Sequence, residues 1–288
     1  MPPSDMKPAA PGIKLSSPAT REFWEIDVLF EDDHLLAISK PARLLTSPDR
    51  YDPNRPNLMR LLLEGVAAGK PWAKERGLTY LANAHRLDFE TTGILLLAKD
   101  RPSLVTLANH FGSEIPKKRY LALVHGTPAE DEFTVDQALA PDRFEIGLMR
   151  VSRTGKKSVT DFKVLEKFTG CSLVECRPHT GRTHQIRVHL QYAGHPIYGD
   201  MTYGGDWLLL SVIKRGDYRL KPGRTERPLI GSLALHAAML DLPHPVTGAP
   251  VHIEAPTPRE FNVALKYLRR YGGAAGVVPD DGGPVEQS

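Results

Sequence analysis

The chain has 288 residues, of which 41% are hydrophobic and 25% are charged, and its formal net charge is +3. This composition is ordinary for a globular protein with a sizeable core. No apolar run approaches the ~20 residues that a membrane-spanning helix needs, and no hydrophobic segment at the N-terminus is typical of a secretory signal. The only two cysteines, Cys171 and Cys176, are too few for a disulfide framework. We therefore expect a reduced, cytoplasmic protein without a membrane anchor.

Biased composition marks both ends of the chain. Residues 1–21 contain five prolines, and residues 272–288 are rich in glycine and acidic residues. Such segments bury too little apolar surface to offset the entropy lost on ordering. We therefore expect a flexible N-terminal arm over residues 1–21, one folded domain over residues 22–271, and a disordered tail over residues 272–288.

Hydrophobic periodicity predicts the elements of this domain in chain order. A polar Glu-Asp-Asp turn separates two expected strands within residues 26–41. Helical spacing and strand-like patterns alternate after that, with helices expected at 56–70, 101–114 and 257–271 and strands at 94–97, 117–126, 158–168 and 171–178. Because no βαβ period repeats, the pattern favours an α+β fold over a doubly wound one.

One carboxylate stands out in HRLDFETTGILLLAKD, residues 85–100. Asp88 is followed by a Thr-Thr-Gly turn that leads into the apolar run from Ile94. A charge at the mouth of a buried strand is costly unless another group pairs with it or the protein uses it. Asp88 is therefore either a functional carboxylate or the partner of Arg86 in an ion pair that ties the turn.

A second stretch, residues 176–200, contains an expected helix that begins at the N-cap Thr183 and ends before Gly194. Its apolar stripe has the spacing i, i+3, i+4, i+7, with Ile186, His189, Leu190 and Ala193. Arg182 would lie just outside the helix N-terminus. From there its guanidinium could reach a carboxylate or a phosphate across a cleft.

The sequence disfavours several common chemistries. His179, His184 and His189 are five residues apart, whereas metal-binding pairs on one helix prefer a spacing of three or four, so we expect no metal site. There is no Gly-x-Ser-x-Gly elbow, no Walker loop and no dinucleotide fingerprint. We therefore expect neither a nucleotide cofactor nor serine chemistry.

Positive charge concentrates in residues 143–187, which hold ten Lys and Arg against four Asp and Glu. Lys156 and Lys157 lie within this stretch, and Lys117 and Lys118 lie just upstream. Such a stretch is either an ordinary solvated surface or a surface that faces phosphates. Charge alone does not separate these two interpretations.

Several of these motifs, taken in order, resemble the RluA family of RNA pseudouridine synthases. The stretch HRLD with ETTGILLLAK is similar to the family's catalytic motif, and KRYLALVHG resembles its Lys-x-Tyr strand. TGRTHQIRVH matches the third motif, and GHPIYGD and LALHAAMLDLPHP resemble the elements that follow. ISKPARLLTSP resembles the early Lys-Pro motif, except that Arg43 stands where the family usually has glycine. The resemblance extends from about residue 26 to residue 270.

The resemblance implies a pseudouridine synthase fold, a mixed and mostly antiparallel sheet with flanking helices around a central RNA-binding cleft. It also implies an enzyme that breaks the N-glycosidic bond of a uridine, rotates the uracil and rejoins it through C5. Asp88 would be the catalytic residue, without cofactor or metal. It would act either as a nucleophile at the sugar or as a base on the C2′ proton, and the sequence leaves both roles open.

The same resemblance assigns supporting residues. Tyr120 would stack on the target base, Arg182 would pair with Asp88, Ile186 would wall the base pocket, and Arg86 would contact the flipped-out RNA. Lys117, Lys118, Lys156 and Lys157 are weaker RNA-binding candidates, and His85 and His236 have no role assigned. About twenty residues precede the first expected strand, so we expect no S4 RNA-binding module. The expected partner is a stem-loop of ribosomal or transfer RNA, bound by a monomer without an obligate protein partner.

Two other functions remain as alternatives. A glycosidase could use Asp88 with Glu90, but paired acids usually lie about 5–10 Å apart on separate elements rather than in one turn. A non-catalytic RNA-binding protein would need only the basic surface.

Overall fold

The structure is a computed structural model, and it describes residues 12–49, 52, 55–214, 218–220 and 223–273. Most of the expected C-terminal tail, residues 274–288, lies outside the described residues, as do the first eleven residues of the expected arm. No helix in the described ranges is long and apolar enough to cross a membrane.

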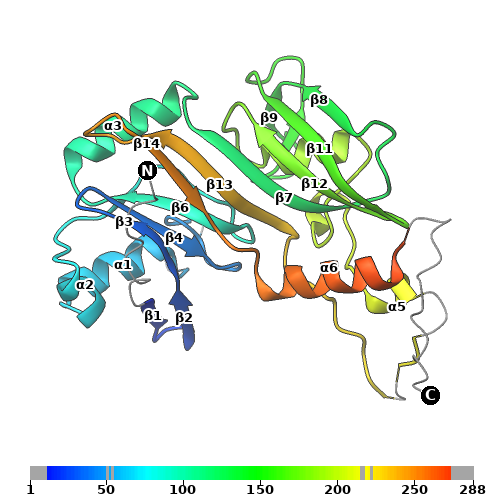
Figure 1. The fold of residues 1–288 in the computed structure, drawn as a ribbon, viewed down its shortest axis with the longest axis horizontal. Coiled ribbons are helices and arrows are strands. Elements are labelled where there is room, and N and C mark those ends of the chain that lie inside the picture. Colours follow the sequence, from blue (N-terminus) through cyan, green and yellow to red (C-terminus); the bar gives the residue numbers. More distant parts are fainter. Residues whose placement is uncertain (1–11, 50–51, 53–54, 215–217, 221–222, 274–288) are drawn as a thin grey trace, which may run out of the picture.

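A ten-stranded sheet forms the centre of the fold (Figure 1). Eight strands follow one another across it in the order β3 (Val28–Glu31), β4 (Leu35–Lys40), β6 (Thr92–Ala98), β13 (Leu235–Pro243), β7 (Lys117–His125), β12 (Cys171–Pro178), β11 (Val159–Phe168) and β8 (Glu132–Asp136). Two more strands join this path, with β14 (Pro250–Glu254) on β13 and β5 (Ala82–Asn83) on β6. Among the described strands of this sheet, β13 and β6 pair in parallel and the other neighbours pair antiparallel, so the expected mixed, mostly antiparallel α+β sheet is confirmed.

Helices flank both halves of the sheet. They are α1 (Leu58–Ala67), α2 (Pro71–Glu75), α3 (Arg101–Gly112), α4 (Gln185–Tyr192), the 3-10 helix η1 (Met201–Tyr203), α5 (Leu210–Lys214) and α6 (Arg259–Tyr271). Two small antiparallel ladders complete the fold, one of β1 (Ile13–Ser17) with β2 (Glu22–Ile26) and one of β9 (Leu139–Pro141) with β10 (Met149–Val151). The three helices expected from periodicity correspond to α1, α3 and α6.

The apolar run in β6 is explained by a sheet that is covered on both faces. Leu95 and Leu97 pack into one core cluster, which includes residues of α1. Ile94 and Leu96 pack into another, which includes Leu107 of α3. Because successive side chains of a strand point to opposite faces, a strand buried on both sides reads as a continuous hydrophobic run.

The N-terminal segment differs from the expected flexible arm. Residues 13–17 form β1, which pairs with β2 along its whole length, and Ile13 and Leu15 are buried in the same cluster as Leu36 and Ile38. The alternation of buried and exposed residues in β1 is typical of a half-buried strand. Residues 13–17 therefore do not belong to a flexible arm, and the prolines around this short strand hide its alternation in the sequence.

Ile13→Ala is therefore expected to lower the free energy of unfolding by about 2–5 kcal/mol, the usual cost of removing a buried aliphatic side chain. The matched control is Lys14→Ala, because the Lys14 side chain is 78% exposed. Urea titration of both variants measures the difference. Equal stability of the two variants would show that the hairpin does not contribute to the core.

The two halves of the sheet meet where β6 and β13 pair, and Gly93 of β6 lies opposite Ala237 of β13 at this seam. Its φ is +106°, and a Cβ at this position would lie 2.2 Å from the carbonyl oxygen of Ala237 in β13. Only glycine allows so close an approach. The Thr-Thr-Gly turn thus brings the segment that carries Asp88 against the middle of the sheet.

Candidate active site

Asp88 lies in the loop between β5 and β6. Lys40, at the end of β4, hydrogen-bonds to the backbone of this loop. The Lys40 side chain is fully buried and donates hydrogen bonds to the carbonyl oxygens of Phe89 and Thr91 at 3.2 and 3.0 Å. Burial lowers the pKa of Lys40 to about 7, against the opposing charge of Asp88. Burying a lysine is costly unless its ammonium group is hydrogen-bonded. Here the hydrogen bonds to two backbone carbonyls of the loop compensate for burial and hold the loop in place. This contact gives the Lys-Pro motif a structural function.

Arg43, which stands where the family usually has glycine, adopts a left-handed conformation with φ +59°. Glycine enters this region without strain, whereas other residues rarely do. The Arg43 guanidinium donates to the carbonyl oxygen of Gly231, and its Nε lies 4.0 Å from Glu90. Arg43 therefore adopts a backbone conformation that is open to glycine, and Glu90 faces Arg43.

Arg187, not Arg182, is the arginine that pairs with Asp88. Its Nη1 lies 3.3 Å from Asp88 Oδ2, whereas Arg182 donates to the carbonyl oxygen of Lys157 and lies 3.4 Å from Glu114. The expected Arg182–Asp88 pair and the alternative Arg86–Asp88 pair were therefore both wrong. Arg187 faces the pocket from the first turn of α4, while Arg182 lies on the loop before it.

Asp200 holds the Arg187 guanidinium in place. The Arg187 Nε and Nη2 donate to the two oxygens of Asp200 at 2.7 and 2.8 Å, and Asp200 is 2% exposed. Burial disfavours the charge on Arg187, but Asp200 and Asp88 more than offset it and raise its pKa above the usual value. A bidentate arginine–carboxylate pair fixes orientation as well as distance. It leaves Nη1 aimed at Asp88.

The start of α4 also differs from the expected one. The helix begins at Gln185 after His184, which has φ +55°, so Thr183 is not its N-cap. The Gln185 side chain stabilises the preceding loop by accepting hydrogen bonds from the Arg182 backbone N–H and the Thr180 hydroxyl. Gly194, with φ +84°, follows the end of the helix as expected.

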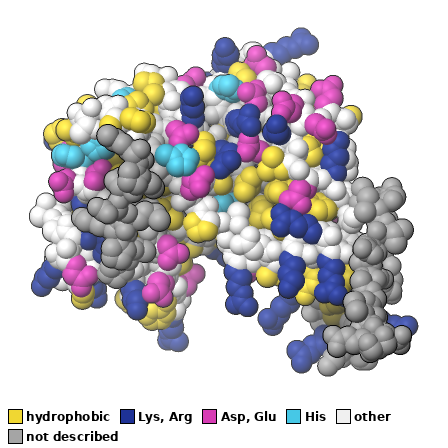
Figure 2. All heavy atoms as spheres, viewed as in Figure 1, with side chains coloured by type: hydrophobic (Ala, Val, Ile, Leu, Met, Phe, Trp, Pro, Cys, Tyr) yellow, Lys and Arg dark blue, Asp and Glu magenta, His cyan; other side chains and the backbone are white. Residues whose placement is uncertain are grey.

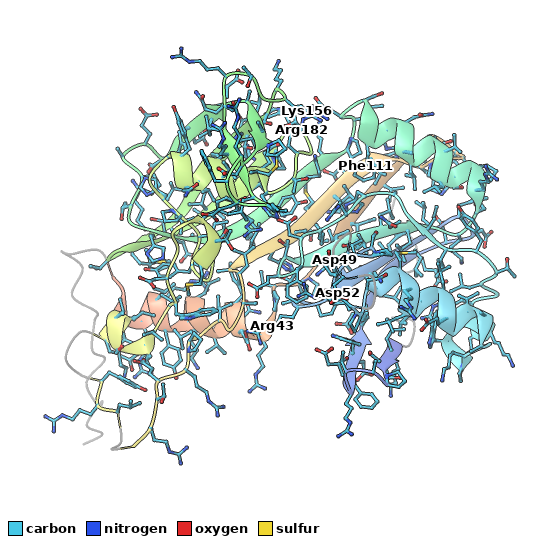
Figure 3. All side chains as sticks on the ribbon, turned by 180° about the vertical axis from the view of Figure 1, so that it is seen from behind. Arg43, Asp49, Asp52, Phe111, Lys156 and Arg182 are labelled. Atoms are coloured by element: carbon cyan, nitrogen blue, oxygen red, sulfur yellow. The ribbon has the colours of Figure 1, made fainter. Side chains whose placement is uncertain are left out.

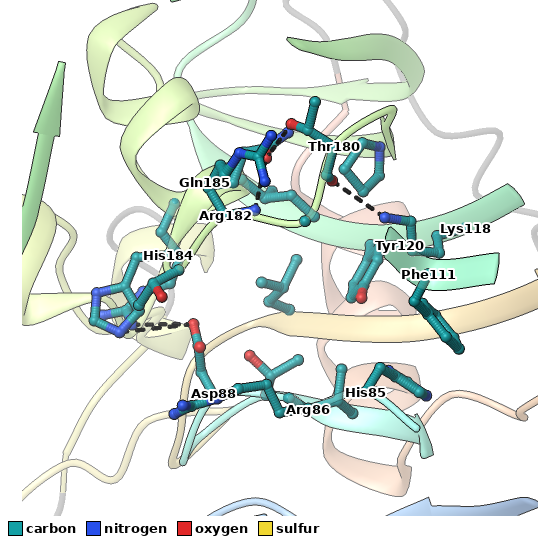
Figure 4. Close-up of a pocket in the computed structure, with 18 of the residues that line it drawn as sticks. His85, Arg86, Asp88, Phe111, Lys118, Tyr120, Thr180, Arg182, His184 and Gln185 are labelled. Carbon is teal, nitrogen blue, oxygen red and sulfur yellow. Dashed lines mark hydrogen bonds and ion pairs between the residues drawn. The ribbon is translucent and has the colours of Figure 1, made fainter. Parts of the chain in front are cut away.

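A pocket of about 370 Å³ surrounds Asp88 (Figure 4). Tyr120 and Leu235 on neighbouring strands and Ile186 on α4 contribute apolar surface, and Arg86 is exposed at its edge. Its volume, its apolar walls and its few polar groups are typical of a site that binds a small molecule or one unit of a larger ligand. The pocket brings together all four expected substrate-binding residues, Arg86, Tyr120, Arg182 and Ile186, with Asp88.

Comparison with known proteins identifies the family. The signature of the RNA pseudouridylate synthase family matches residues 34–192. Ribosomal large subunit pseudouridine synthase C of Salmonella typhi is 38% identical over 244 residues, which cover 84% of this chain and 70% of the relative. The chain belongs to the RNA pseudouridine synthase family, in its RluA branch. It is thus an RNA-modifying isomerase.

Other relatives of the synthase agree in sequence and in fold. An RNA pseudouridine synthase of Bacillus subtilis, YlyB, is 34% identical over 252 residues, which cover 87% of this chain and 75% of the relative. The solved structure of human RNA pseudouridylate synthase domain containing 4 covers 84% of this chain and 92% of its own, with 26% identity and a TM-score of 0.63. Human RNA pseudouridylate synthase domain containing 1 has the same identity and a TM-score of 0.59, with 81% of this chain and 84% of its own covered. The expected pseudouridine synthase fold is confirmed.

The histidines of the synthase have different partners instead of a shared ligand. His179 lies 2.6 Å from Asp161, and His189 contacts the Thr160 hydroxyl and the Gln137 carbonyl oxygen. Among the described residues no group of three His, Cys, Asp or Glu side chains could hold a metal ion.

His85 and His236, which had no expected role, make contacts within and between strands. His85 Nε2 accepts from the Leu96 backbone N–H at 3.0 Å, and burial lowers its pKa to about 3. His236 contacts the Thr92 hydroxyl at 2.8 Å and the Ala255 carbonyl oxygen at 3.2 Å. Both rings therefore hold neighbouring segments together, and His85 also lines the pocket.

The basic candidates other than Lys156 line the pocket or the hollows next to it. Arg182 donates to the carbonyl oxygen of Lys157, the residue after Lys156 (Figure 3), and Lys157 lines a hollow next to the pocket together with Arg182. Lys118 lines the pocket itself and donates to the Thr180 carbonyl oxygen at 3.1 Å, and burial lowers its pKa to about 8. Lys117 lines a neighbouring groove. On the face shown in Figure 2, basic and acidic side chains are interspersed over the upper part, whereas Lys and Arg side chains gather along the lower right.

Sequence reasoning missed Arg187, Asp200 and His184. Arg187 lies in QIRVH and Asp200 ends GHPIYGD, so both were inside the matched motifs. An arginine in the first turn of a helix reads as an ordinary surface residue, and Asp200 becomes its partner only through the fold. Two features of the sequence could have pointed to them. Arg187 follows His184 by three residues, a spacing that would place both on one face of a helix, and Asp200 is an acidic residue at the end of the next motif.

Substitution of Tyr120 tests whether its ring, and not its hydroxyl, contacts the target base. Base–aromatic stacking is worth about 1–3 kcal/mol, so we expect Tyr120→Leu to lower kcat/KM by about 10- to 100-fold. Tyr120→Phe retains the stacking face and is expected to cost much less. Steady-state kinetics with one RNA measures both variants. A larger loss in the Phe variant than in the Leu variant would transfer the role to the hydroxyl.

Proposed function

We propose that this synthase isomerises specific uridines to pseudouridine in structured RNA with Asp88 as its catalytic residue and without a cofactor. The observation that carries the proposal is the position of Asp88, which faces a pocket with apolar walls and is oriented by Arg187. The carboxylate acts either as a nucleophile at the sugar or as a base on its C2′ proton. In both routes the N-glycosidic bond breaks, the uracil turns, and C5 forms the new bond to the sugar.

The other pocket residues can hold the uracil while it turns between bond cleavage and bond formation. The ring of Tyr120 stacks on uracil in any orientation, because stacking does not require particular hydrogen bonds. Burial raises the pKa of Tyr120 above its usual value, so the phenol is neutral. Ile186 walls the pocket, and Arg86 is exposed at its edge, where flanking nucleotides would lie.

Flipping the target nucleotide out of its stack costs a few kcal/mol, and phosphate contacts offset this cost. We assign these contacts to Arg182, Lys156 and Lys157, with weaker contributions from Lys117 and Lys118. The relatives named after the large ribosomal subunit make ribosomal RNA the first substrate to test, and transfer RNA the second.

In this proposal the synthase acts as a monomer in the cytoplasm. Asp88, Arg187, Asp200 and Tyr120 all belong to one chain, so the pocket needs no residue from a second copy.

The direct test uses RNA labelled with tritium at C5 of uridine. Because C5 loses its hydrogen when it forms the new glycosidic bond, isomerisation releases tritium to water and leaves the base attached. The glycosidase alternative would instead release free uracil, and a binding protein would release neither. Pseudouridine mapping in total RNA from cells with and without the gene then identifies the RNA and the position.

Activity is expected to be unchanged by EDTA. The bond changes need only a carboxylate and a pocket that holds the base, and Arg187 provides the positive charge next to Asp88. Tritium release is measured before and after chelation, with the RNA fold checked in parallel because RNA itself binds divalent ions. Loss of activity that a catalytic amount of one metal restores, with the RNA fold intact, would contradict the absence of a cofactor.

A further inference from the structure

His184 is the pocket residue whose backbone is least expected. Its φ of +55° belongs to the left-handed region, which residues other than glycine rarely occupy and which often marks functional sites. Its side chain is 18% exposed and lies beside Asp88 (Figure 4). The conformation turns the ring into the pocket at the point where α4 begins.

One side of the His184 ring is fixed by Tyr203. His184 Nδ1 lies 2.7 Å from the Tyr203 hydroxyl, and the backbone N–H of Met149 donates to the same oxygen at 2.9 Å. Tyr203 is 3% exposed, and a buried hydroxyl proton without an acceptor is costly. Within the described residues, His184 Nδ1 is the acceptor in contact with this hydroxyl. Nδ1 therefore accepts from Tyr203, and a neutral ring carries its proton on Nε2.

The other side of the ring faces the candidate catalytic carboxylate. His184 Nε2 lies 3.9 Å from Asp88 Oδ2, the same oxygen that Arg187 contacts at 3.3 Å. Oδ1 of Asp88 has no hydrogen-bond partner in the part of the chain that the structure describes. A separation of 3.9 Å is too long for a hydrogen bond, but catalytic contacts often shorten when the substrate binds.

We propose that His184 is a positioning residue, whose Nε2–H tautomer, set by Tyr203, donates to Asp88 Oδ2 and leaves Oδ1 as the oxygen that reacts with the uridine. The proposal rests on the proposed function for its catalytic part, while the tautomer is a property of the free protein. Burial lowers the pKa of His184, with Asp88 opposing, so the ring is neutral near pH 7. Burial likewise raises the pKa of Tyr203, which keeps the proton that it donates.

The tautomer can be read directly from the nitrogen chemical shifts of the histidine rings in long-range ¹H–¹⁵N NMR spectra. The protein has 11 histidines, and the signals lost in His184→Gln identify the ring. We expect the Nε2–H form at pH 7 in the wild type and a mixture of both tautomers in Tyr203→Phe. An Nδ1–H form or an imidazolium in the wild type would overturn the proposal. This measurement needs neither RNA nor activity.

Single-turnover kinetics at saturating RNA tests the effect on Asp88. His184→Phe fills the space without a donor, and we expect the rate to fall by about 100-fold, as for a misplaced catalytic group. The Kd for RNA should stay nearly unchanged. His184→Gln can place an amide N–H near the position of Nε2, so we expect it to recover at least about tenfold of the loss. A purely structural role would not separate Gln from Phe in rate when their melting temperatures agree.

The matched control is His189→Gln on the same helix. This ring bonds to Thr160 and the Gln137 carbonyl oxygen, away from Asp88, so the variant should lose stability but retain the single-turnover rate below its melting temperature. A wild-type rate in His184→Phe, or an equal loss in the Gln and Phe variants, would overturn the proposal. If the wild type makes no pseudouridine, the proposed function is wrong. The NMR spectra then still decide whether the His184 ring carries its proton on Nε2.

Discussion

Asp88→Asn is expected to abolish pseudouridine formation while the Kd for RNA changes by less than about tenfold, or ~1.4 kcal/mol. Asparagine is nearly the same size, so the pocket keeps its shape, but it can act neither as a nucleophile at the sugar nor as a base. Removing a negative charge near phosphates can even tighten binding. The variant therefore separates chemistry from recognition.

Tritium release and a filter-binding titration on the same RNA measure the two effects. Glu90→Gln is the matched control, since Glu90 lies in the same loop but faces Arg43. It should retain turnover, whereas the two-carboxylate glycosidase alternative expects both variants to be inactive. Substantial isomerisation by Asp88→Asn would show that the motif is only a structural turn.

Arg187→Met is expected to reduce both stability and turnover. The change leaves Asp200 buried without its partner, and an unpaired buried charge typically costs about 3–5 kcal/mol in free energy of unfolding. It also removes the donor that orients Asp88, so turnover should fall by about 100-fold or more when the protein is still folded. Denaturant unfolding and single-turnover kinetics measure the two losses separately.

A second substitution separates the causes. In the double variant Arg187→Met with Asp200→Leu, an apolar pair replaces the buried ion pair, and such replacements often restore stability. Turnover should remain low, because Asp88 still lacks its partner. Arg182→Ala is the control, since its pair with Glu114 is partly exposed and worth about 0–1 kcal/mol. Because Arg182 is also assigned a phosphate contact, turnover is compared at saturating RNA, where a greater loss in Arg182→Ala than in Arg187→Met would return the orienting role to Arg182.

Local pattern was enough to single out the candidate carboxylate and to predict most of the elements of this protein. The carboxylate of Asp88 at the start of a buried strand, and the glycine that follows it, are features of adjacent residues. Periodicity over residues 56–70 predicted α1, which begins at Leu58 after Asn57, whose side chain accepts from the Arg60 backbone N–H. The hydrophobic periods of helices and strands involve residues only a few positions apart, so they can be recognised without knowledge of the fold.

Tertiary structure alone decided which groups meet Asp88. Arg182 and Arg187 are five residues apart, and the left-handed turn at His184 between them determines which one faces the carboxylate. Asp200 reaches Arg187 from another segment, and β1 is buried only because β2 pairs with it and the core lies beneath. Such contacts depend on a left-handed backbone conformation that residues other than glycine seldom adopt, and on pairing between segments that are distant in the sequence. Neither leaves a periodic signal in the sequence.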